Sequence, residues 1–247
     1  MQEQVERTAE ALRRKVERLP DGERILVGMT GRPGGGKTTF CTALLHELEV
    51  RLPGQVAFVP MDGFHFTRAQ LDSFPNSKDA HYRRGAVDTF NAEAWAELVR
   101  RLKSMRSDET VSVPGFDHAV KDPEEGKIQV PGSSRIILLE GNYLMLRREP
   151  WASAAHLFDE RILIDTPRED TVERLAKRNF EAGICPTYEE TLSRVLAVDV
   201  LNGDLIMSES LEPTIRIVTS YDPGYVNASE AAVGKDDVAA QVERNDA

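Results

Sequence analysis

The sequence is poor in the features that mark secreted, membrane-bound or disulfide-stabilised proteins. Its 247 residues include only two cysteines, Cys41 and Cys185, which are too few for a disulfide framework. No apolar stretch approaches the roughly 18 residues that a membrane-spanning helix needs, and the polar N-terminus lacks the apolar core of a signal peptide. We therefore expect a cytoplasmic protein that does not bind membranes.

Positive charge is also scarce. The chain has 31 Lys and Arg residues against 41 Asp and Glu residues, which gives a formal net charge of −10. Proteins that bind polyanions usually have the opposite balance, so we expect no nucleic-acid partner, although a local basic site for phosphate fits this composition. Hydrophobic residues make up 40% of the chain, which is enough for the core of one large domain.

Short apolar runs alternate with helical patterns along the chain. This alternation predicts an α/β fold in which helices cover both faces of a mostly parallel sheet. In such folds, ligands bind beyond the carboxyl ends of the strands. The expected strands lie at residues 25–29, 55–60, 135–140, 160–165 and 214–218, and the expected helices at 3–18, 38–50, 151–157, 170–182, 187–198 and after Asn91.

The remaining segments carry polar and turn-forming residues. We expect residues 61–90 to be irregular, residues 106–134 to form a loop or hairpin insertion, and residues 227–247 to form a flexible acidic tail. Residues 1–226 would then form a single domain.

The glycine-rich segment at residues 31–38 matches the phosphate-binding pattern Gly-x4-Gly-Lys-Ser/Thr at every fixed position. It lies between a predicted strand and a predicted helix, which is the context that such a loop requires. Glycines allow backbone N–H groups to face the phosphates, and the helix N-terminus adds a positive partial charge. We expect Lys37 to reach the β- and γ-phosphates and the Thr38 hydroxyl to bind Mg²⁺. The predicted nucleotide-binding residues are Gly31, Arg32, Pro33, Gly34, Gly35, Gly36, Lys37, Thr38 and Thr39.

Asp62 directly follows the second predicted strand and precedes Gly63. Its position at the carboxyl end of a strand is expected to bring it close to the phosphate loop. Phosphoryl transfer to an alcohol needs a group that orients the hydroxyl and accepts its proton, and an ionised aspartate suits that role. An Asp-Gly pair alone is more often a simple turn, but its location after a strand favours a catalytic base.

Together with the phosphate loop, four further motifs resemble the phosphoribulokinase/uridine kinase family, which includes bacterial-type pantothenate kinases. These motifs are Pro-Met-Asp-Gly-Phe-His at 60–65, Arg-Arg-Gly-Ala at 83–86 with Thr-Phe at 89–90, Val-Pro-Gly-Phe-Asp-His at 113–118, and Leu-Glu-Gly-Asn-Tyr at 139–143. They occur in the family's order, and the resemblance spans roughly residues 24–220. It implies the P-loop NTPase fold and an ATP-dependent kinase.

Glu140 ends the third predicted strand, where P-loop proteins carry an acid that binds Mg²⁺ directly or through water. We expect it to form a metal site with Thr38. A glutamate that caps a helix or closes a turn is the alternative, and the sequence favours neither of the two.

Arg174, Lys177 and Arg178 share one face of a predicted helix, because they are spaced three and four residues apart. The resemblance implies a cationic lid at about residues 170–198, in which Arg174 and Arg178 would stabilise the transferring phosphoryl group. On spacing alone, a solvated face paired with neighbouring acids is the more common arrangement.

The resemblance also implies an acceptor pocket. Phe116 would offer a stacking face and His118 a neutral donor or acceptor, while an ordinary core role for Phe116 and a structural role for His118 are the alternatives. The sequence departs from the family pattern at Val87, at Asn91 and in residues 198–202, and these departures leave the acceptor open. The predicted acceptor-site residues are His65, Arg84, Phe116, Asp117, His118, Asn142 and Tyr143.

The sequence therefore favours an ATP-dependent kinase that phosphorylates a hydroxyl of a nucleoside, a pantothenate-like compound or a sugar. A P-loop NTPase that drives a partner is one alternative, although the chain lacks the Asn-Lys-x-Asp segment of GTPases. A nucleotide-binding regulator without catalysis is another, and the presence of Lys37, Thr38 and Asp62 argues against it. A homodimer is a further expectation.

Overall fold

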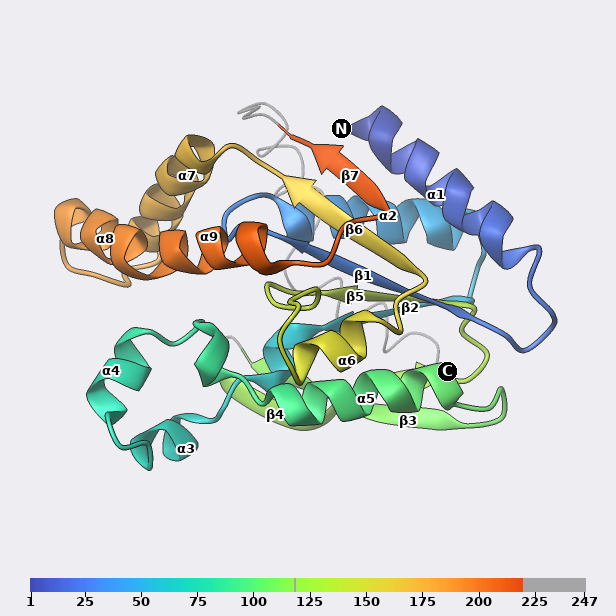
Figure 1. Ribbon diagram of the computed structural model, residues 1–247, viewed down its shortest axis with the longest axis horizontal. Helices are drawn as coiled ribbons and strands as arrows, with labels where there is room; N and C mark the ends of the chain where they lie inside the picture. The colour runs from blue at the N-terminus through green and yellow to red at the C-terminus, as the bar shows by residue number, and fades with distance from the viewer. Residues whose placement is uncertain (118, 220–247) are drawn as a thin grey trace.

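A five-stranded sheet forms the centre of the protein, whose computed structural model describes residues 1–117 and 119–219. The strand order is β2-β5-β1-β6-β7, and each neighbouring pair runs parallel (Figure 1). The predicted α/β fold with a mostly parallel sheet is confirmed. The strands are β1 (Ile25–Gly31), β2 (Val56–Pro60), β5 (Ile136–Glu140), β6 (Glu160–Asp165) and β7 (Ile215–Val218).

The central strand β1 is buried along its whole length. Because successive side chains of a strand point to opposite faces, Leu26 packs into the core on one side of the sheet and Val27 into the core on the other. Helices α1 and α2 cover the face of Val27, and α5 and α6 cover the face of Leu26 (Figure 1). The predicted cover on both faces is confirmed. These helices are α1 (Gln2–Val16), α2 (Lys37–Arg51), α5 (Ala92–Ser104) and α6 (Trp151–Ala155).

The predicted insertion at 106–134 is an antiparallel hairpin of β3 (Thr110–Asp117) and β4 (Asp122–Pro131). Its inward side chains Val113 and Val130 are fully buried in the same core as Leu26. The hairpin is therefore anchored below the sheet, beside α5 (Figure 1).

The segment at 61–90 is more ordered than predicted. It contains the 3₁₀ turns η1 (Met61–Phe64) and η2 (Val87–Thr89) and the short helices α3 (Arg68–Asp72) and α4 (Ser77–Tyr82). Thr67 and Gln70 form a reciprocal capping box that starts α3. The Thr-x-x-Gln spacing was available in the sequence as a signal for this helix.

After β6 the chain forms α7 (Arg168–Glu181) and α8 (Tyr188–Arg194), as predicted, but the helical run does not end at residue 198. It passes through the π-helical segment η3 (Val195–Asp199) into α9 (Val200–Glu209), which the sequence did not predict. Figure 1 shows α7, α8 and α9 projecting beyond the carboxyl end of β1.

Across residues 1–117 and 119–219, no helix has the length and apolar character of a membrane span. The predicted tail at 227–247 lies outside the described residues.

Candidate active site

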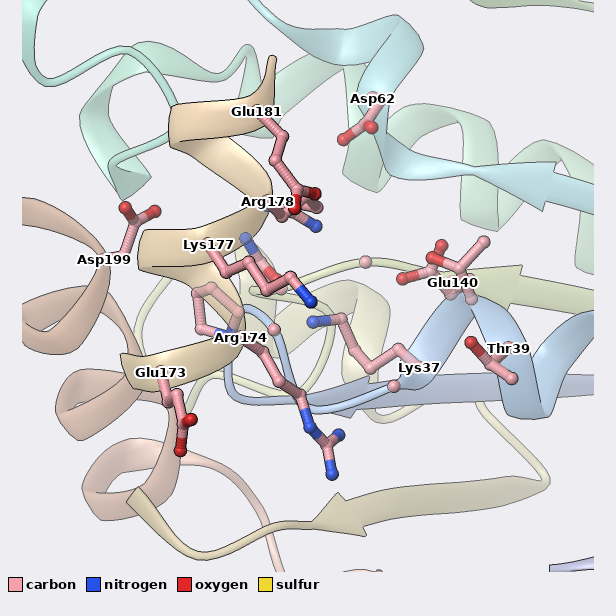
Figure 2. A pocket seen from close by; sticks show the side chains of 16 residues that line it. Lys37, Thr39, Asp62, Glu140, Glu173, Arg174, Lys177, Arg178, Glu181 and Asp199 are labelled. Atoms are coloured by element: carbon pink, nitrogen blue, oxygen red, sulfur yellow. The ribbon is translucent and has the colours of Figure 1, made fainter. Parts of the chain in front are cut away.

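A cavity of about 570 Å³ lies where the phosphate loop, the ends of β2 and β5, and helix α7 meet (Figure 2). Most of the predicted catalytic and nucleotide-binding residues line it. The lining consists of Pro33, Gly34, Gly36, Lys37, Thr38, Thr39, Asp62, Glu140, Gly141, Asn142, Glu173, Arg174, Lys177, Arg178, Glu181 and Asp199.

The phosphate loop has a backbone that only glycine adopts readily. Gly34 and Gly36 have φ angles of 74° and 85°, in the left-handed region where a Cβ is disfavoured. Gly36 is the N-cap of α2, and among the described residues no side chain caps this helix. The N–H groups of its first turn are therefore available for an anion, which the helix dipole also favours.

Lys37 is held in the loop by its own backbone. Its buried side chain donates hydrogen bonds from Nζ to the carbonyl oxygens of Gly31, at 3.0 Å, and Arg32, at 3.1 Å. Burial lowers the pKa of Lys37, while the charges of Glu140 and Asp62 oppose this shift. An ammonium group has three donors, so Lys37 can keep both carbonyl contacts and still bind a phosphate oxygen.

Asp62 and Glu140 come from adjacent strands. Pro60 at the end of β2 is in register with Glu140 at the end of β5, and Asp62 follows two residues later. Gly141 allows the close approach of these segments, because a Cβ there would lie 2.4 Å from the Cβ of Met61. The two carboxylates thus reach one cavity from neighbouring strand ends.

Gly63, next to Asp62, packs against the hairpin. A Cβ at this position would lie 2.1 Å from the carbonyl oxygen of Pro114 in β3, and the φ of Gly63 is not positive. The glycine of the Asp-Gly pair is therefore explained by close backbone packing, not by turn geometry. This contact fixes the segment that carries Asp62.

Glu140 is in an environment that disfavours its charge. Desolvation raises its pKa to about 7, Lys37 opposes the shift, Asp62 adds to it, and a hydrogen bond from the Thr38 side chain opposes it. Glu140 is half-buried and its charge is opposed by the nearby carboxylate of Asp62, so a cation bound between the two would be favoured. Mg²⁺ in nucleotide sites takes one or two carboxylates and completes its shell with phosphate oxygens and water, so these residues fit such an ion. In the described part of the chain, no group of three or more His, Cys, Asp and Glu side chains forms a metal site by itself.

Helix α7 brings charge of both signs to the cavity. Arg174, Lys177 and Arg178 line it, together with Glu173 and Glu181. Figure 2 shows the amino group of Lys177 pointing toward that of Lys37, with Arg178 on the side of Asp62. The face of α7 that sequence spacing singled out is the face that lies over the cavity.

Asp199 also lines the cavity, and the sequence did not predict this role. Its Oδ2 has no hydrogen-bond partner among the described residues and lies 3.9 Å from Nη1 of Arg194. Burial raises the pKa of Asp199, and the charges of Arg194 and Arg178 oppose that shift. The sequence signal that could have identified Asp199 is the segment 198–202. This segment departs from the family pattern, and no site was predicted in it.

Three of the predicted acceptor residues form a cluster at the hairpin, which we call the His65–Arg84–Phe116 cluster. The ring of His65 lies 5.2 Å from that of Phe116, and the guanidinium carbon of Arg84 lies 5.7 Å from the centroid of Phe116. Arg84 also forms an ion pair of 2.7 Å with Asp122 of β4. Nδ1 of His65 is 2.9 Å from the carbonyl oxygen of Asp62, so the cluster adjoins Asp62 but is not part of the cavity lining.

The other predicted acceptor residues are dispersed. Asn142 lines the cavity, whereas Tyr143 is fully buried and its hydroxyl donates to the carbonyl oxygen of Gly85 at 2.7 Å. Oδ1 of Asp117 accepts from the backbone N–H groups of Ala119 and Val120 in the hairpin turn. His118 lies outside the described residues. Substrate contacts by these residues stay predictions.

The chain matches the sequence pattern described as "Phosphoribulokinase / Uridine kinase family" over residues 26–191. It is 36% identical over 207 residues to "Putative uridine kinase C227.14" of Schizosaccharomyces pombe, covering 83% of this chain and 88% of that protein. It is 44% identical over 153 residues to "ATP-dependent kinase-like protein notR'" of Aspergillus versicolor, covering 61% of this chain and 89% of that protein. The solved structure of a "putative fructose transport system kinase" from Silicibacter sp. TM1040 superposes with a TM-score of 0.72 at 28% identity. The match covers 84% of this chain and 97% of that protein's chain.

Proposed function

The chain belongs to the phosphoribulokinase/uridine kinase family and is a P-loop kinase, and we propose that it transfers the γ-phosphoryl group of ATP to a hydroxyl of a small molecule. The observation that carries this proposal is that Lys37, Asp62 and Glu140, from three separate elements, line one cavity beside helix α7. That arrangement supplies a phosphate cradle, a proton acceptor and a metal-binding carboxylate together.

The triphosphate would bind to the N–H groups of the phosphate loop and to the remaining donor of Lys37. Thr38 and Glu140 would hold Mg²⁺, which supplies charge neutralisation between the β- and γ-phosphates when it is bound. Lys37 is buried, and because charges attract more strongly where water is excluded, its attraction to the phosphate would be strengthened.

Asp62 would act as the catalytic base. Its carboxylate is exposed to the cavity and would accept the proton of the acceptor hydroxyl as that oxygen forms a bond to the γ-phosphorus. The bond from the γ-phosphorus to the bridging oxygen breaks, and ADP leaves with that oxygen. The hydrogen bond between His65 and the Asp62 carbonyl keeps this segment in place.

Arg174 and Arg178 would offset the negative charge on the transferring phosphoryl group, with Lys177 beside them. Charged donors stabilise the charge that develops in a transition state most strongly when they are already in position and little water intervenes. In Figure 2 the amino group of Lys177 faces that of Lys37, whereas Arg178 lies on the side of Asp62 and Arg174 on the opposite side. A small closing movement of α7 would bring the two arginines to the phosphoryl group.

The acceptor would enter from the side of the His65–Arg84–Phe116 cluster, which adjoins Asp62. A nucleoside, a sugar and a pantothenate-like compound are the candidates. The relatives' names refer to uridine and to fructose transport, and these words make nucleosides and hexoses the first acceptors to test. A homodimer, a cytoplasmic location and the lack of a nucleic-acid partner stay predictions.

The test is ADP release with Mg²⁺ and ATP, measured with and without each acceptor. Release that depends on one acceptor class supports the proposal, and the phosphorylated product identifies the hydroxyl. Release of equal rate without any acceptor would instead indicate an NTPase. Tight ATP binding with no release under any condition would indicate a nucleotide-binding regulator.

A further inference from the structure

Arg32 of the phosphate loop is tied to a helix that lies outside the loop's own strand–helix unit. Its Nη1 donates to Oδ1 of Asp204 in α9 at 2.6 Å. The Arg32 side chain is 15% exposed and that of Asp204 is 44% exposed, so water is excluded from the arginine side of this ion pair only. The loop and α9 are 172 residues apart in sequence at this contact.

The same carboxylate reaches a third element. Oδ2 of Asp204 lies 3.5 Å from Nε of Arg168, the first residue of α7. One aspartate therefore links the phosphate loop, α9 and the base of the helix that carries Arg174 and Arg178. Hydrogen bonding by Arg32 holds the pKa of Asp204 below its usual range, so the carboxylate is ionised at neutral pH.

The backbone next to Asp204 packs directly on the loop. A Cβ at Gly203 would lie 3.1 Å from Nη1 of Arg32 and 3.5 Å from Cδ of Pro33. Glycine is unfavourable inside a helix, and this close approach gives a reason for its presence in α9.

The backbone of Arg32 orients the rest of the loop. Its carbonyl oxygen accepts from the N–H of Gly35 at 3.0 Å and from Nζ of Lys37 at 3.1 Å. Holding the Arg32 side chain therefore restrains the peptide that sets both the loop turn and the position of Lys37. A loop that is already in its binding conformation loses less entropy when the triphosphate binds.

We propose that Asp204 is a positioning residue for ATP: by holding Arg32 and Arg168 together, it fixes the phosphate loop against the base of α7. The inference rests on the ATP site of the proposed function and is independent of the acceptor. Because it is tested by ATP binding alone, its failure is distinguishable from failure of the proposed phosphoryl transfer.

The test is the Kd of ATP with Mg²⁺, measured by titration calorimetry on the full chain without acceptor. Asp204→Asn, which keeps the shape and removes the charge, is expected to weaken ATP binding about fivefold to tenfold, in the range of coupling between contacting charged residues. Glu209→Gln is the matched control. Glu209 ends the same helix with a similar side-chain exposure, 40% against 44%, and pairs with Arg148 instead of the loop. It is expected to bind ATP like the unmodified protein.

A double-mutant cycle with Arg32→Met identifies the route of the effect. If Asp204 acts through Arg32, the double variant binds ATP no more weakly than Arg32→Met alone. Fold-changes that multiply in the double variant, or an unchanged Kd for Asp204→Asn, would overturn the proposal. Asp204→Glu retains the charge and is expected to retain most of the affinity, and it serves as the second variant if Asp204→Asn does not fold. A weakening by Asp204→Glu as large as that of Asp204→Asn would also overturn the proposal.

Discussion

Asp62 and Glu140 face one cavity from adjacent parallel strands, because Glu140 ends β5 in register with the residue at which β2 ends. Two carboxylates at neighbouring strand ends can have different roles in one site, because one can bind a metal ion while the other accepts a proton. The proposed mechanism assigns the metal to Glu140 and the proton to Asp62.

Glu140→Gln is expected to raise the Mg²⁺ concentration needed for half-maximal turnover by about tenfold or more, as loss of a metal-site group commonly does. Gln keeps the size of the side chain and removes the charge that Mg²⁺ would balance. The measurement is turnover against free Mg²⁺ at fixed ATP. Glu124→Gln on the hairpin, whose carboxylate pairs with Lys127, is the control. An unchanged Mg²⁺ requirement would remove Glu140 from the metal site.

Gly63→Ala is expected to destabilise the protein by about 1–3 kcal/mol, the range for overpacking, and to reduce turnover as well. The added Cβ would collide with the carbonyl oxygen of Pro114, so the Asp62 segment must move away from the hairpin. Urea unfolding and steady-state kinetics measure the two effects.

Gly22→Ala is the control that distinguishes a loss of stability from a loss of turnover in Gly63→Ala. Gly22 has a φ of 84° and open space around it, so alanine is expected to cost about 1–2 kcal/mol through backbone strain alone. This variant should keep its turnover at temperatures where it is folded. If Gly63→Ala also keeps full turnover, then the hairpin contact does not position Asp62.

Arg178→Met is expected to lower kcat by about 10²-fold or more, the typical loss when a group that stabilises transition-state charge is removed. The Kd for ATP should change much less, because the proposed function assigns the main phosphate contacts to the loop and Lys37. Arg100→Met, at an Arg with an exposed side chain on α5 that pairs with Glu97, should match the unmodified protein. A large rise in Kd with kcat retained would indicate that Arg178 serves ground-state binding.

Asp199→Asn is expected to increase stability more at pH 7 than at pH 4. Burial raises the pKa of Asp199 above its ordinary value, with Arg194 and Arg178 opposing, so the folded state holds this proton more tightly than the unfolded state. Ionisation of Asp199 therefore costs stability as the pH rises from the ordinary value of an aspartate through the folded pKa, and Asn removes that cost.

Urea unfolding of Asp199→Asn and of the unmodified protein between pH 4 and pH 7 measures how their difference in stability depends on pH. Asp88→Asn is a control of opposite sign, because hydrogen bonding by Arg83 lowers the pKa of Asp88. Its carboxylate contributes stability above its unfolded pKa that is lost as the pH falls, so Asp88→Asn should be destabilising at pH 7. Identical pH profiles for Asp199→Asn and the unmodified protein would contradict the raised pKa.

The sequence predicted the parts of the site that depend on local pattern. A phosphate loop is contiguous, and Asp62 and Glu140 each follow an apolar strand, so their placement at one edge of a parallel sheet follows from topology. The strand order was not available from the sequence. Only the structure shows that β5 lies between β1 and β2 and so brings Glu140 beside both Lys37 and Asp62.

The features that the sequence missed depend on long-range contacts. Helix α9 contains Asn202 and Gly203, two residue types that disfavour a helix interior, and Gly203 packs against Arg32 of the phosphate loop. Tyr143 follows a strand like the site residues, yet it packs against Phe90 and Trp151 in the core. Spacing in the chain could not separate Tyr143 from Asn142, because adjacent residues in this segment face different surroundings.

The central claim is that Asp62 accepts the proton of an acceptor hydroxyl, and the most direct measurement is acceptor-dependent ADP release by Asp62→Asn. We predict a loss of about 10²–10⁴-fold in kcat, the contribution typical of a positioned general base, with the Kd for ATP nearly unchanged. Asp108→Asn, at an exposed carboxylate that pairs with Arg106, should retain full turnover. Full acceptor-dependent turnover by Asp62→Asn would contradict the account.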